Sequence, residues 1–457
     1  MTSSFILDKQ SIIQSEMKSG RADVLIIGAG AAGLAAAARL SQAGAQVVIL
    51  EARDRIGGRV LTVHPEGLDV TVELGAEFVH GRPPEIFELI HQANIRYRKI
   101  QGQPFCSNEQ AIGRCDFWSR IEKVLDAMKP PVPPRLSFEQ FVNALSDPEV
   151  TAEDKRAACM YVRGFHAAHP DEISVQSLIE GMKAEEEIDG DSQFRLPGGY
   201  DQIVSALHSQ INSGRVRLEL ETAVTHVGWT RSGVRAEAVK KNANRATFEA
   251  RRCVVALPLA NLKSCGASGV TFDPPLSAKQ DALAKLRCGH IVRVTMVFRE
   301  PFWKEMQAEG RSLDRMTFLF SRDPVFPTFW TLIPLDAPVM TAWAPADAAE
   351  RLSSRSNDEI CEQAVAALAR AMHLPVDQIG KQLVRAYTHN WQADSYAQAA
   401  YSYVAVGGAD TQRDFAAPLD KVLFFAGEAT NSAGYHGTVH GAIATGYRVA
   451  EEILSAG

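Results

Sequence analysis

The sequence lacks several features that mark particular classes of protein. It has seven cysteines in 457 residues, and none of them lie in the closely spaced pairs of disulfide-rich or zinc-binding modules. It has no run of lysine and arginine, and its formal net charge of -6 argues against nucleic acid as a partner, because phosphate binding requires concentrated positive charge. We therefore expect a reducing compartment, no metal site and no nucleic-acid partner.

Long hydrophobic runs are also missing. The apolar segment 24–40 is too short, and too interrupted by glycine, to span a membrane. Residues 1–21 carry charged side chains such as Asp8 and Lys18 and lack the long apolar stretch of a signal peptide. The chain shows no internal repeat and no low-complexity tract. We expect a cytoplasmic protein without a membrane span.

What the sequence does contain suits a large folded core. Hydrophobic residues make up 46% of the chain and charged residues 22%, as in ordinary globular proteins. Two domains are expected, because a single core stops growing at roughly 250–300 residues. The run DVLIIG at residues 23–28 predicts a buried strand, residues 31–43 a helix, and residues 46–50 a second strand. This βαβ pattern indicates an α/β fold with a parallel sheet.

A glycine-rich turn joins the first strand to this helix. Gly28, Gly30 and Gly33 match the spacing G-x-G-x-x-G, and Glu51 follows the second strand. The first glycine permits a tight turn, the second lets the backbone approach a pyrophosphate, and the third lets helix and strand pack closely. The helix N-terminus stabilises phosphate charge, and the carboxylate can accept hydrogen bonds from a ribose. The pattern predicts dinucleotide binding without choosing between NAD and FAD.

The residues that follow favour FAD through a family resemblance. The run EARDRIGGR at residues 51–59 resembles the second signature of the flavin-containing amine oxidase family, which includes monoamine oxidases, polyamine oxidases and lysine-specific histone demethylases. In that family the paired glycines and the arginine lie against the FAD phosphates, a role that suits the planar donor fork of Arg59. The resemblance continues in the family's order from Asp23 to Leu454.

Further segments carry the same resemblance. The run at residues 72–81 resembles the segment under the flavin, residues 195–200 the return into the FAD domain, and residues 222–224 the adenine-contacting strand. The C-terminal flavin signature is matched at residues 425–430 and 438–442. The cofactor-binding residues that the resemblance implies are Gly28, Gly30, Ala32, Gly33, Glu51, Ala52, Arg53, Gly58, Arg59, Gly75, Ala76, Glu77, Phe78, Val224, Trp391, Gly427, Glu428, Thr438 and Val439.

The resemblance also implies two discontinuous domains. The first is a Rossmann-like FAD-binding domain, a parallel sheet with helices, formed by residues 22–81, 195–270 and 415–457. The second is an α+β substrate-binding domain formed by residues 82–194 and 271–414.

Local patterns predict the elements of these domains. Residues 82–195 read as helical segments, with Ser137 as a helix cap after the proline-rich break at residues 129–134. Strands are expected at residues 216–221, 224–229, 253–257, 289–298 and 338–344, a helix at 357–372, and a strand, loop and helix within 422–454.

The chemistry that the resemblance implies is the FAD-dependent oxidation of a primary or secondary amine. The product is an imine, which water converts to an aldehyde or ketone, while oxygen reoxidises the flavin and releases hydrogen peroxide. Trp391 matches the family's tryptophan beside the flavin, and Tyr401 and Tyr435 match the two aromatic residues that flank the amine. A single aromatic residue is more often part of a core, so only the family register selects these three. The expected partners are a small-molecule amine and oxygen, and a homodimer is possible.

Two positions depart from the family. Ala400 stands where covalent monoamine oxidases have the cysteine that attaches the flavin, so we expect non-covalent FAD. Arg293 stands where the family usually has a lysine that holds a water against the flavin's reactive nitrogen, and it completes the expected catalytic set of Arg293, Trp391, Tyr401 and Tyr435.

The arginine opens alternatives to an oxidase. It stays protonated and cannot readily exchange a proton, which favours a flavin desaturase or dehydrogenase that uses an acceptor other than oxygen. Arg293 could equally point into a salt bridge elsewhere, because strand alternation fixes its face only if the register is right. A flavoprotein that binds without turnover is a third alternative.

The substrate class depends on weaker patterns. His80 stands where polyamine oxidases tend to carry an acid, and no arginine for a substrate carboxylate is obvious nearby, which favours a small or aromatic monoamine. Glu185, Glu186 and Glu187 could form an acidic entrance, although a solvated helix face is the more common role of such a run. His80 and His166 could line the cavity, but a lone histidine is more often structural. A histone-type substrate is not expected, because no long helical-hairpin insertion is present.

Overall fold

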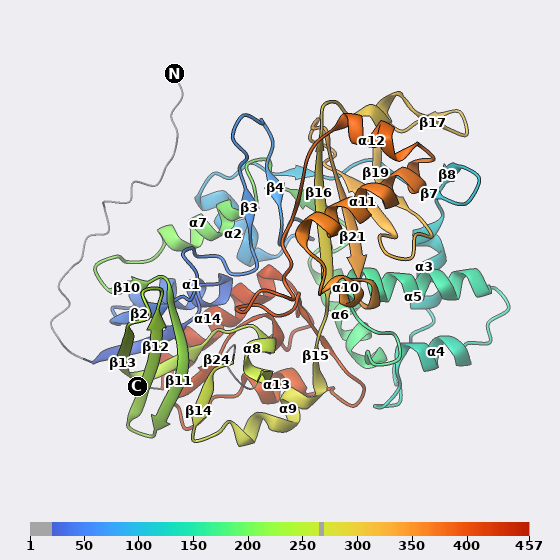
Figure 1. Cartoon of the computed structure of the whole chain (residues 1–457). Coiled ribbons are helices and arrows are strands. Elements are labelled where there is room, and N and C mark those ends of the chain that lie inside the picture. The colour runs from blue at the N-terminus through green and yellow to red at the C-terminus, as the bar shows by residue number, and fades with distance from the viewer. Residues whose placement is uncertain (1–20, 265–268, 457) are drawn as a thin grey trace.

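Two large β-sheets flanked by helices form the protein (Figure 1). The computed structural model describes residues 21–264 and 269–456. Residues 1–20, to which the signal-peptide expectation applies, and Cys265 lie outside the described residues.

The first sheet contains the predicted βαβ unit. Its strands are β1 (Ala22–Ile27), β2 (Val47–Leu50), β10 (Val216–Glu219), β11 (Thr222–Thr230), β12 (Gly233–Lys240), β13 (Arg245–Val255), β14 (Thr271–Asp273) and β24 (Leu423–Phe425). Their order is β10-β2-β1-β13-β12-β11-β14, with β24 paired to β13. β10, β2, β1, β13 and β24 pair in parallel, whereas β13, β12 and β11 form an antiparallel meander. The parallel α/β core is therefore confirmed.

Small residues let two helices pack closely beside this sheet. Helix α1 (Ala31–Gln42) contacts the C-terminal helix α14 (Val439–Ser455), as Figure 1 shows. A Cβ at Gly446 would lie 2.3 Å from the Ala32 carbonyl oxygen, so a larger residue there would push the helices apart.

The second sheet is built from segments far apart in the sequence. Its strands are β7 (Gln103–Ser107), β8 (Ile112–Arg114), β16 (Ile291–Phe298), β19 (Met316–Phe320), β20 (Thr328–Thr331), β21 (Val339–Pro345) and β22 (Leu383–Thr388). Their order is β22-β16-β21-β20-β19-β7-β8. Helix α11 (Asn357–Met372) has the predicted bounds, and its apolar residues belong to the same core as β16.

Helices dominate residues 82–195, as predicted. They are α2 (Pro84–Gln92), α3 (Phe117–Leu125), α4 (Phe138–Ala144), α5 (Ala152–His166) and α6 (Val175–Glu187). The predicted cap of α4 is confirmed, because the Ser137 side chain accepts the Gln140 N–H at 3.2 Å in a capping box.

Short strands accompany these helices, and one expectation for the cysteines of this segment is wrong. The segment contains the short strands β6 (Arg98–Lys99), β7, β8 and β9 (Gln193–Arg195). The β7–β8 hairpin brings together Cys106 and Cys115, nine positions apart, as a disulfide. The expectation of a reducing compartment assumed that no two cysteines pair. The Cys106–Cys115 disulfide contradicts that assumption.

The remaining elements are short. They are β3 (Thr62–Val63), β4 (Val72–Glu73), β5 (Val79–His80), β15 (Leu286–Cys288), β17 (Gln307–Ala308), β18 (Arg311–Ser312), β23 (Ser402–Val404), α7 (Asp201–Ser209), α8 (Leu259–Lys263), α9 (Gln280–Lys285), α10 (Asp347–Leu352), α12 (Val376–Gln382) and α13 (Thr411–Ala416), with 3-10 turns at Ser277–Lys279, Phe302–Glu305 and Glu428–Thr430. β14 joins the first sheet, although the expected boundary at residue 270 assigned it to the second domain.

Among the described residues, no helix combines the length and apolarity needed to cross a membrane.

Candidate active site

The turn between β1 and α1 has the geometry of a phosphate-binding loop. Gly28 has a φ of +104°, and a Cβ at Gly33 would lie 1.9 Å from the Gly28 carbonyl oxygen, so neither position accepts a side chain. Gly30 is the N-cap of α1, and no atom lies within 4 Å of the place its Cβ would take. Bare backbone and a helix N-terminus therefore face open space, which suits a pyrophosphate.

Glu51, after β2, holds this loop in place. Its Oε2 accepts the Ala29 N–H at 2.8 Å, and its Oε1 accepts the Arg53 N–H at 2.9 Å. Burial raises the pKa of this carboxyl group, and the two N–H groups act in the opposite direction. Each carboxylate oxygen keeps a further lone pair, so Glu51 can bind a ribose while it fixes the turn.

The second signature packs directly onto the loop. Gly57 forms an isolated β-bridge with Gly30, and Gly57 and Gly58 have φ values of +99° and +58°. Arg55 donates to three backbone carbonyl oxygens within residues 56–60 and so stabilises this turn.

The two arginines predicted to contact the cofactor differ in their pairing. Arg53 donates to both carboxylate oxygens of Asp394, at 2.8 and 2.9 Å. Arg59 contacts Glu428 at 3.1 Å and the Ala400 carbonyl oxygen, and its side chain stays 29% exposed. Arg59 is the better candidate for a phosphate contact, because its side chain is more exposed than that of Arg53, which is 13% exposed and paired with both oxygens of Asp394.

Glu428 joins three segments of the site. Its Oε2 accepts the Ser402 hydroxyl at 2.6 Å and the Gly437 N–H at 2.9 Å, while its Oε1 pairs with Arg59. The family resemblance assigns Glu428 to the ribityl-phosphate region of FAD. This carboxylate holds the loop that leads to Thr438, the N-cap of α14.

These elements surround a cavity of about 730 Å³. Every residue predicted to bind the cofactor lines it except Gly33, whose Cα faces β1 and allows the predicted close packing. The residues predicted to be catalytic, Arg293, Trp391, Tyr401 and Tyr435, line the same cavity. One space therefore extends from the phosphate loop to the aromatic residues, and its volume is typical of a ligand site.

Hydrogen bonds to backbone fix the three aromatic side chains. Trp391 Nε1 donates to the Leu74 carbonyl oxygen at 2.8 Å. The Tyr401 hydroxyl donates to the Phe165 carbonyl oxygen at 2.7 Å, and the Tyr435 hydroxyl to that of Ala184 at 3.0 Å. Burial raises the pKa of both tyrosines, so they are neutral donors. Both hydroxyls are thus bonded to helices, and the rings are left to line the cavity.

Four neutral histidines line the cavity as well. Burial lowers the pKa of His80 to about 4 and that of His166 to about 3, so both are neutral at pH 7. Both line the cavity, as the sequence allowed. His436 and His440 were not predicted, and burial lowers their pKa values too, that of His440 to about 3. Only the C-terminal flavin signature could have indicated them, because His440 lies within it and His436 lies just before it. Because all four are uncharged at pH 7, they do not repel a cationic amine.

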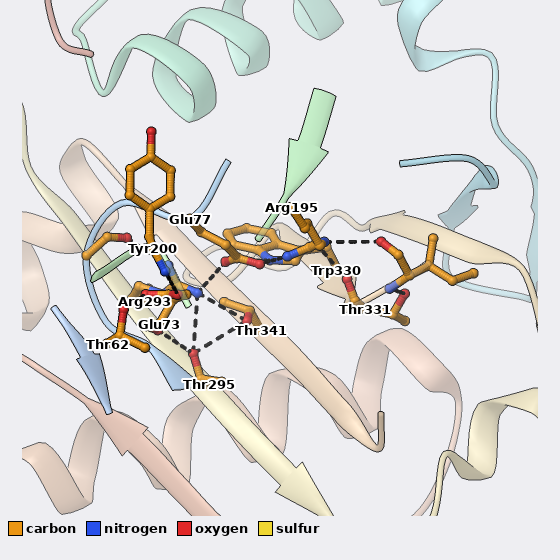
Figure 2. A network of polar contacts seen from close by, with 12 residues as sticks. Thr62, Glu73, Glu77, Arg195, Tyr200, Arg293, Thr295, Trp330, Thr331 and Thr341 are labelled. Carbon is orange, nitrogen blue, oxygen red and sulfur yellow. Dashed lines mark hydrogen bonds and ion pairs between the residues drawn. The ribbon is translucent and has the colours of Figure 1, made fainter. Parts of the chain in front are cut away.

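Arg293 belongs to a buried cluster of charges at the cavity wall (Figure 2). Its Nη2 donates to Glu77 Oε2 at 2.5 Å, and its Nη1 donates to the Gly75 carbonyl oxygen at 2.9 Å. Glu77 also pairs with Arg195 and accepts from Trp330 Nε1 at 3.1 Å. The salt-bridge alternative for Arg293 is therefore realised, although the residue also lines the cavity. Arg195 and Trp330 were not predicted as members of the site.

Glu185 differs from its neighbours in the acidic run. It lines the cavity, whereas Glu186 and Glu187 are exposed on α6, as a solvated helix face requires. Burial, with a smaller contribution from Asp191, raises the pKa of Glu185 to about 7. Within the described part of the chain its carboxylate has no hydrogen bond or ion pair, unlike Glu51, Glu77 and Glu428.

Outside the cavity, one surface group resembles a metal site. His169 bonds through Nδ1 to Asp347 at 2.8 Å and through Nε2 to Glu350 at 3.0 Å. Both ring nitrogens are thus already occupied, and nothing else in the described residues points to an ion.

A comparison with protein families now identifies the chain. The model of the family described as flavin-containing amine oxidoreductase matches residues 31–154 and 120–454. The chain belongs to the flavin-containing amine oxidoreductase family. This match confirms the predicted family and its flavin cofactor.

Relatives of several kinds share this family. Polyamine oxidase 3 of Oryza sativa subsp. japonica is 28% identical over 95% of this chain and 90% of its own length. Flavin-containing amine oxidase B of Mus musculus is 24% identical over 96% of this chain and 87% of its own length. Lysine-specific histone demethylase 1 homolog 2 of Oryza sativa subsp. japonica is 26% identical over 95% of this chain, which spans 57% of that protein's length.

A solved structure confirms the fold class. The structure of putrescine oxidase bound to putrescine has a TM-score of 0.76 and 23% sequence identity, and it covers 95% of this chain and 99% of its own. The likeness at this identity concerns the fold alone.

The cavity of this family member fits FAD. The bare phosphate loop offers backbone donors, and Arg59 offers a guanidinium beside it. Three polar atoms of cavity-lining residues, His436 Nδ1, His440 Nε2 and Arg293 Nε, are buried without a hydrogen-bond partner among the described residues. A bound group with polar ring atoms would satisfy such atoms, which are costly when left unpaired.

We expect acid to release the FAD intact. Ala400 offers no sulfur for attachment, and no cysteine of the described residues lines the cavity. The measurement is acid precipitation followed by absorbance of the supernatant and comparison with authentic FAD by chromatography. Yellow colour that stays with the precipitated polypeptide would contradict non-covalent binding.

Proposed function

We propose that this family member is an FAD-dependent amine oxidase. It oxidises a primary or secondary amine to an imine, which water converts to an aldehyde or ketone, and it passes the electrons to oxygen with release of hydrogen peroxide. The division into an FAD-binding and a substrate-binding domain is part of this proposal.

One observation carries the proposal. A continuous cavity of about 730 Å³ joins the phosphate loop to Trp391, Tyr401 and Tyr435. The histidines that line it are neutral, and aromatic rings extend the wall, with Phe165 stacked on Tyr161 at 5.2 Å and Phe78 tilted against Trp330 at 5.6 Å. Such a wall excludes water and favours the uncharged amine, the form that can be oxidised.

The residues of the chain bind and orient the substrate. The fixed rings of Tyr401 and Tyr435 offer π faces to an amine that enters the cavity. Holding the C–H bond beside the amine at one distance and angle replaces a random encounter, which is the protein's main contribution to rate. The bound flavin supplies the redox chemistry by accepting a hydride from that carbon.

Anaerobic mixing with a panel of primary and secondary amines tests the proposal. At least one amine is expected to bleach the oxidised flavin, and admission of air is then expected to restore the colour and to form peroxide. Free FAD with the same amines is the control. A panel that leaves the flavin oxidised throughout would refute amine oxidation.

The second candidate is a flavin-dependent desaturase or dehydrogenase that uses an acceptor other than oxygen. It is favoured by Arg293, which is engaged with Glu77 and does not offer the exchangeable proton of a lysine. Reoxidation of the reduced protein in aerated buffer, beside reoxidation by a quinone, separates the two. Slow reaction with oxygen and rapid turnover with the quinone would favour this candidate.

Glu185→Gln is expected to weaken the binding of amines that carry a second cationic group. The Glu185 carboxylate lies at the cavity wall without a partner among the described residues, and a hydrogen bond to a charged group contributes roughly 1.5–3 kcal/mol. We expect KM for a diamine to rise about tenfold and KM for a monoamine of equal length to change less than about twofold. Kinetics at pH 8, above the raised pKa of about 7, keep Glu185 ionised.

The control for this prediction is Glu186→Gln, which changes an exposed residue of the same helix. It is expected to leave both KM values unchanged. Equal changes for diamine and monoamine in Glu185→Gln would mean that Glu185 only shapes the wall.

A further inference from the structure

Two buried guanidinium groups share one carboxylate in the cluster of Glu77, Arg195, Arg293 and Trp330, termed the Glu77 cluster (Figure 2). The side chains of the three charged residues are only 4–5% exposed. Burial lowers the pKa of both arginines, to about 9 for Arg195 and about 10 for Arg293, and both stay protonated at neutral pH. The Glu77 cluster therefore contains two positive charges and one negative charge.

Another buried carboxylate, that of Glu73, interacts with both arginines but does not cancel the excess below pH 7. Glu73 accepts the Thr62 hydroxyl and the Tyr200 N–H, each at 2.7 Å, and forms no ion pair within the described residues. Burial raises the pKa of Glu73 to about 7, so the group is mainly neutral at pH 6. One positive charge then remains uncompensated, which is costly in a buried position unless an anion can bind.

The excess charge is directed toward the cavity through Arg293. Arg195 is turned away, because its Nε and Nη2 donate to the carbonyl oxygens of Ile333 and Thr331 at 3.1 and 2.8 Å and it does not line the cavity. Arg293 lines the cavity, and its Nε is a buried donor without a partner among the described residues. Trp330 Nε1 donates to both oxygens of Glu77, at 3.2 and 3.1 Å, and so helps to hold the carboxylate between the two arginines.

We propose that Glu77 and Arg195 are positioning residues that set, with opposite signs, the positive charge that Arg293 presents to an electron-rich flavin. Arg195 does not line the cavity and acts through Glu77 and Arg293, whereas Glu77 lines the cavity and acts through its ion pair with Arg293. The inference rests on the proposed function only for the presence of a flavin in the cavity. It concerns the affinity of the site for negative charge and not the identity of the amine.

Sulfite is the probe for this charge. It adds reversibly to an oxidised flavin, bleaches it and leaves the ring with an added negative charge, so its dissociation constant reports the local positive charge without any amine. Glu77→Gln removes a negative charge and is expected to lower the dissociation constant about tenfold at pH 6. Arg195→Met removes a positive charge and is expected to raise it about tenfold. The double variant is expected to return close to the parent value.

Charge-neutral variants separate electrostatics from loss of structure. Arg195→Lys keeps the charge, and Trp330→Phe removes the hydrogen bonds to Glu77 and part of the ring but no charge, so both are expected to stay within about threefold of the parent. The midpoint potential of the flavin should rise in Glu77→Gln and fall in Arg195→Met. A merely structural role would shift the two single variants in the same direction, and that result overturns the proposal. If Arg195→Met does not fold, Glu77→Gln against Trp330→Phe still gives the sign.

Failure of the charge assignment and failure of the proposed function can be distinguished. Opposite shifts in sulfite affinity without bleaching by any amine would support the charge assignment and refute amine oxidation. Bleaching by an amine, together with sulfite affinities that shift in the same direction in both single variants, would support amine oxidation and refute the charge assignment.

Discussion

Glu51→Ala is expected to weaken FAD binding by roughly 10- to 150-fold, since hydrogen bonds to a charged group contribute about 1.5–3 kcal/mol and 1.4 kcal/mol corresponds to tenfold. The carboxylate can bind a ribose, and it already holds the Ala29 N–H at 2.8 Å and the Arg53 N–H at 2.9 Å. The change therefore removes a ligand contact and also releases the phosphate loop. The measurement is the dissociation constant of FAD for the apoprotein.

A second variant distinguishes these two contributions. Glu51→Gln keeps one acceptor oxygen and the side-chain volume but loses the charge, so we expect an intermediate loss of affinity. Thermal unfolding of the apoprotein reports the part that comes from the loop alone. An unchanged dissociation constant in Glu51→Ala would mean that the acid does not meet the ribose.

The glycine-rich turn and the position of Glu51 beside it could be predicted because they depend on local geometry. Gly28 and Gly33 are required by backbone positions within one turn, and Glu51 is placed by the strand that follows. Such constraints depend on a few neighbouring residues, and the sequence displays them directly. The family resemblance then added positions such as Val439, which line the same cavity.

The Glu77 cluster could not be predicted in the same way. Glu77 is separated from Arg293 by 216 positions and from Trp330 by 253, so only the tertiary fold brings them together. β16 is buried at all eight residues, and its side chains therefore show no alternation from which the face of Arg293 could be inferred. The resemblance gave the position of Arg293 but not its partners.

Two features of residues 82–195 were visible only in the structure. In β7 the buried residues Phe105 and Ser107 alternate with less buried ones, but the sequence QPFCS does not alternate between apolar and polar residues and so carries no strand period. On α6, Ser177, Gly181 and Glu185 line the cavity at intervals of four, so one acidic residue of the run belongs to an inward stripe. The acidic run hid this stripe because all its members carry the same charge.

Arg293→Met is expected to lower the midpoint potential of the flavin by about 40 mV, equivalent to about 2 kcal/mol for a two-electron couple. In the parent, Arg293 is paired with Glu77 and lines the cavity, and its charge favours the electron-rich reduced flavin. Without it, Glu77 and Arg195 form a neutral pair, and that stabilisation is lost. FAD affinity should change little, because the phosphate loop is untouched.

Arg293→Lys provides the matched control. It restores the charge, so we expect a potential close to that of the parent, and it offers an exchangeable proton and a family-like anchor for a water. Its reduced flavin is therefore expected to react faster with oxygen than that of the parent. Redox titration and stopped-flow reoxidation of the three proteins check both quantities. If the parent, Arg293→Met and Arg293→Lys agree in potential and in reoxidation rate, the guanidinium serves only its salt bridge with Glu77, and the departure from the family's lysine has no effect on the flavin.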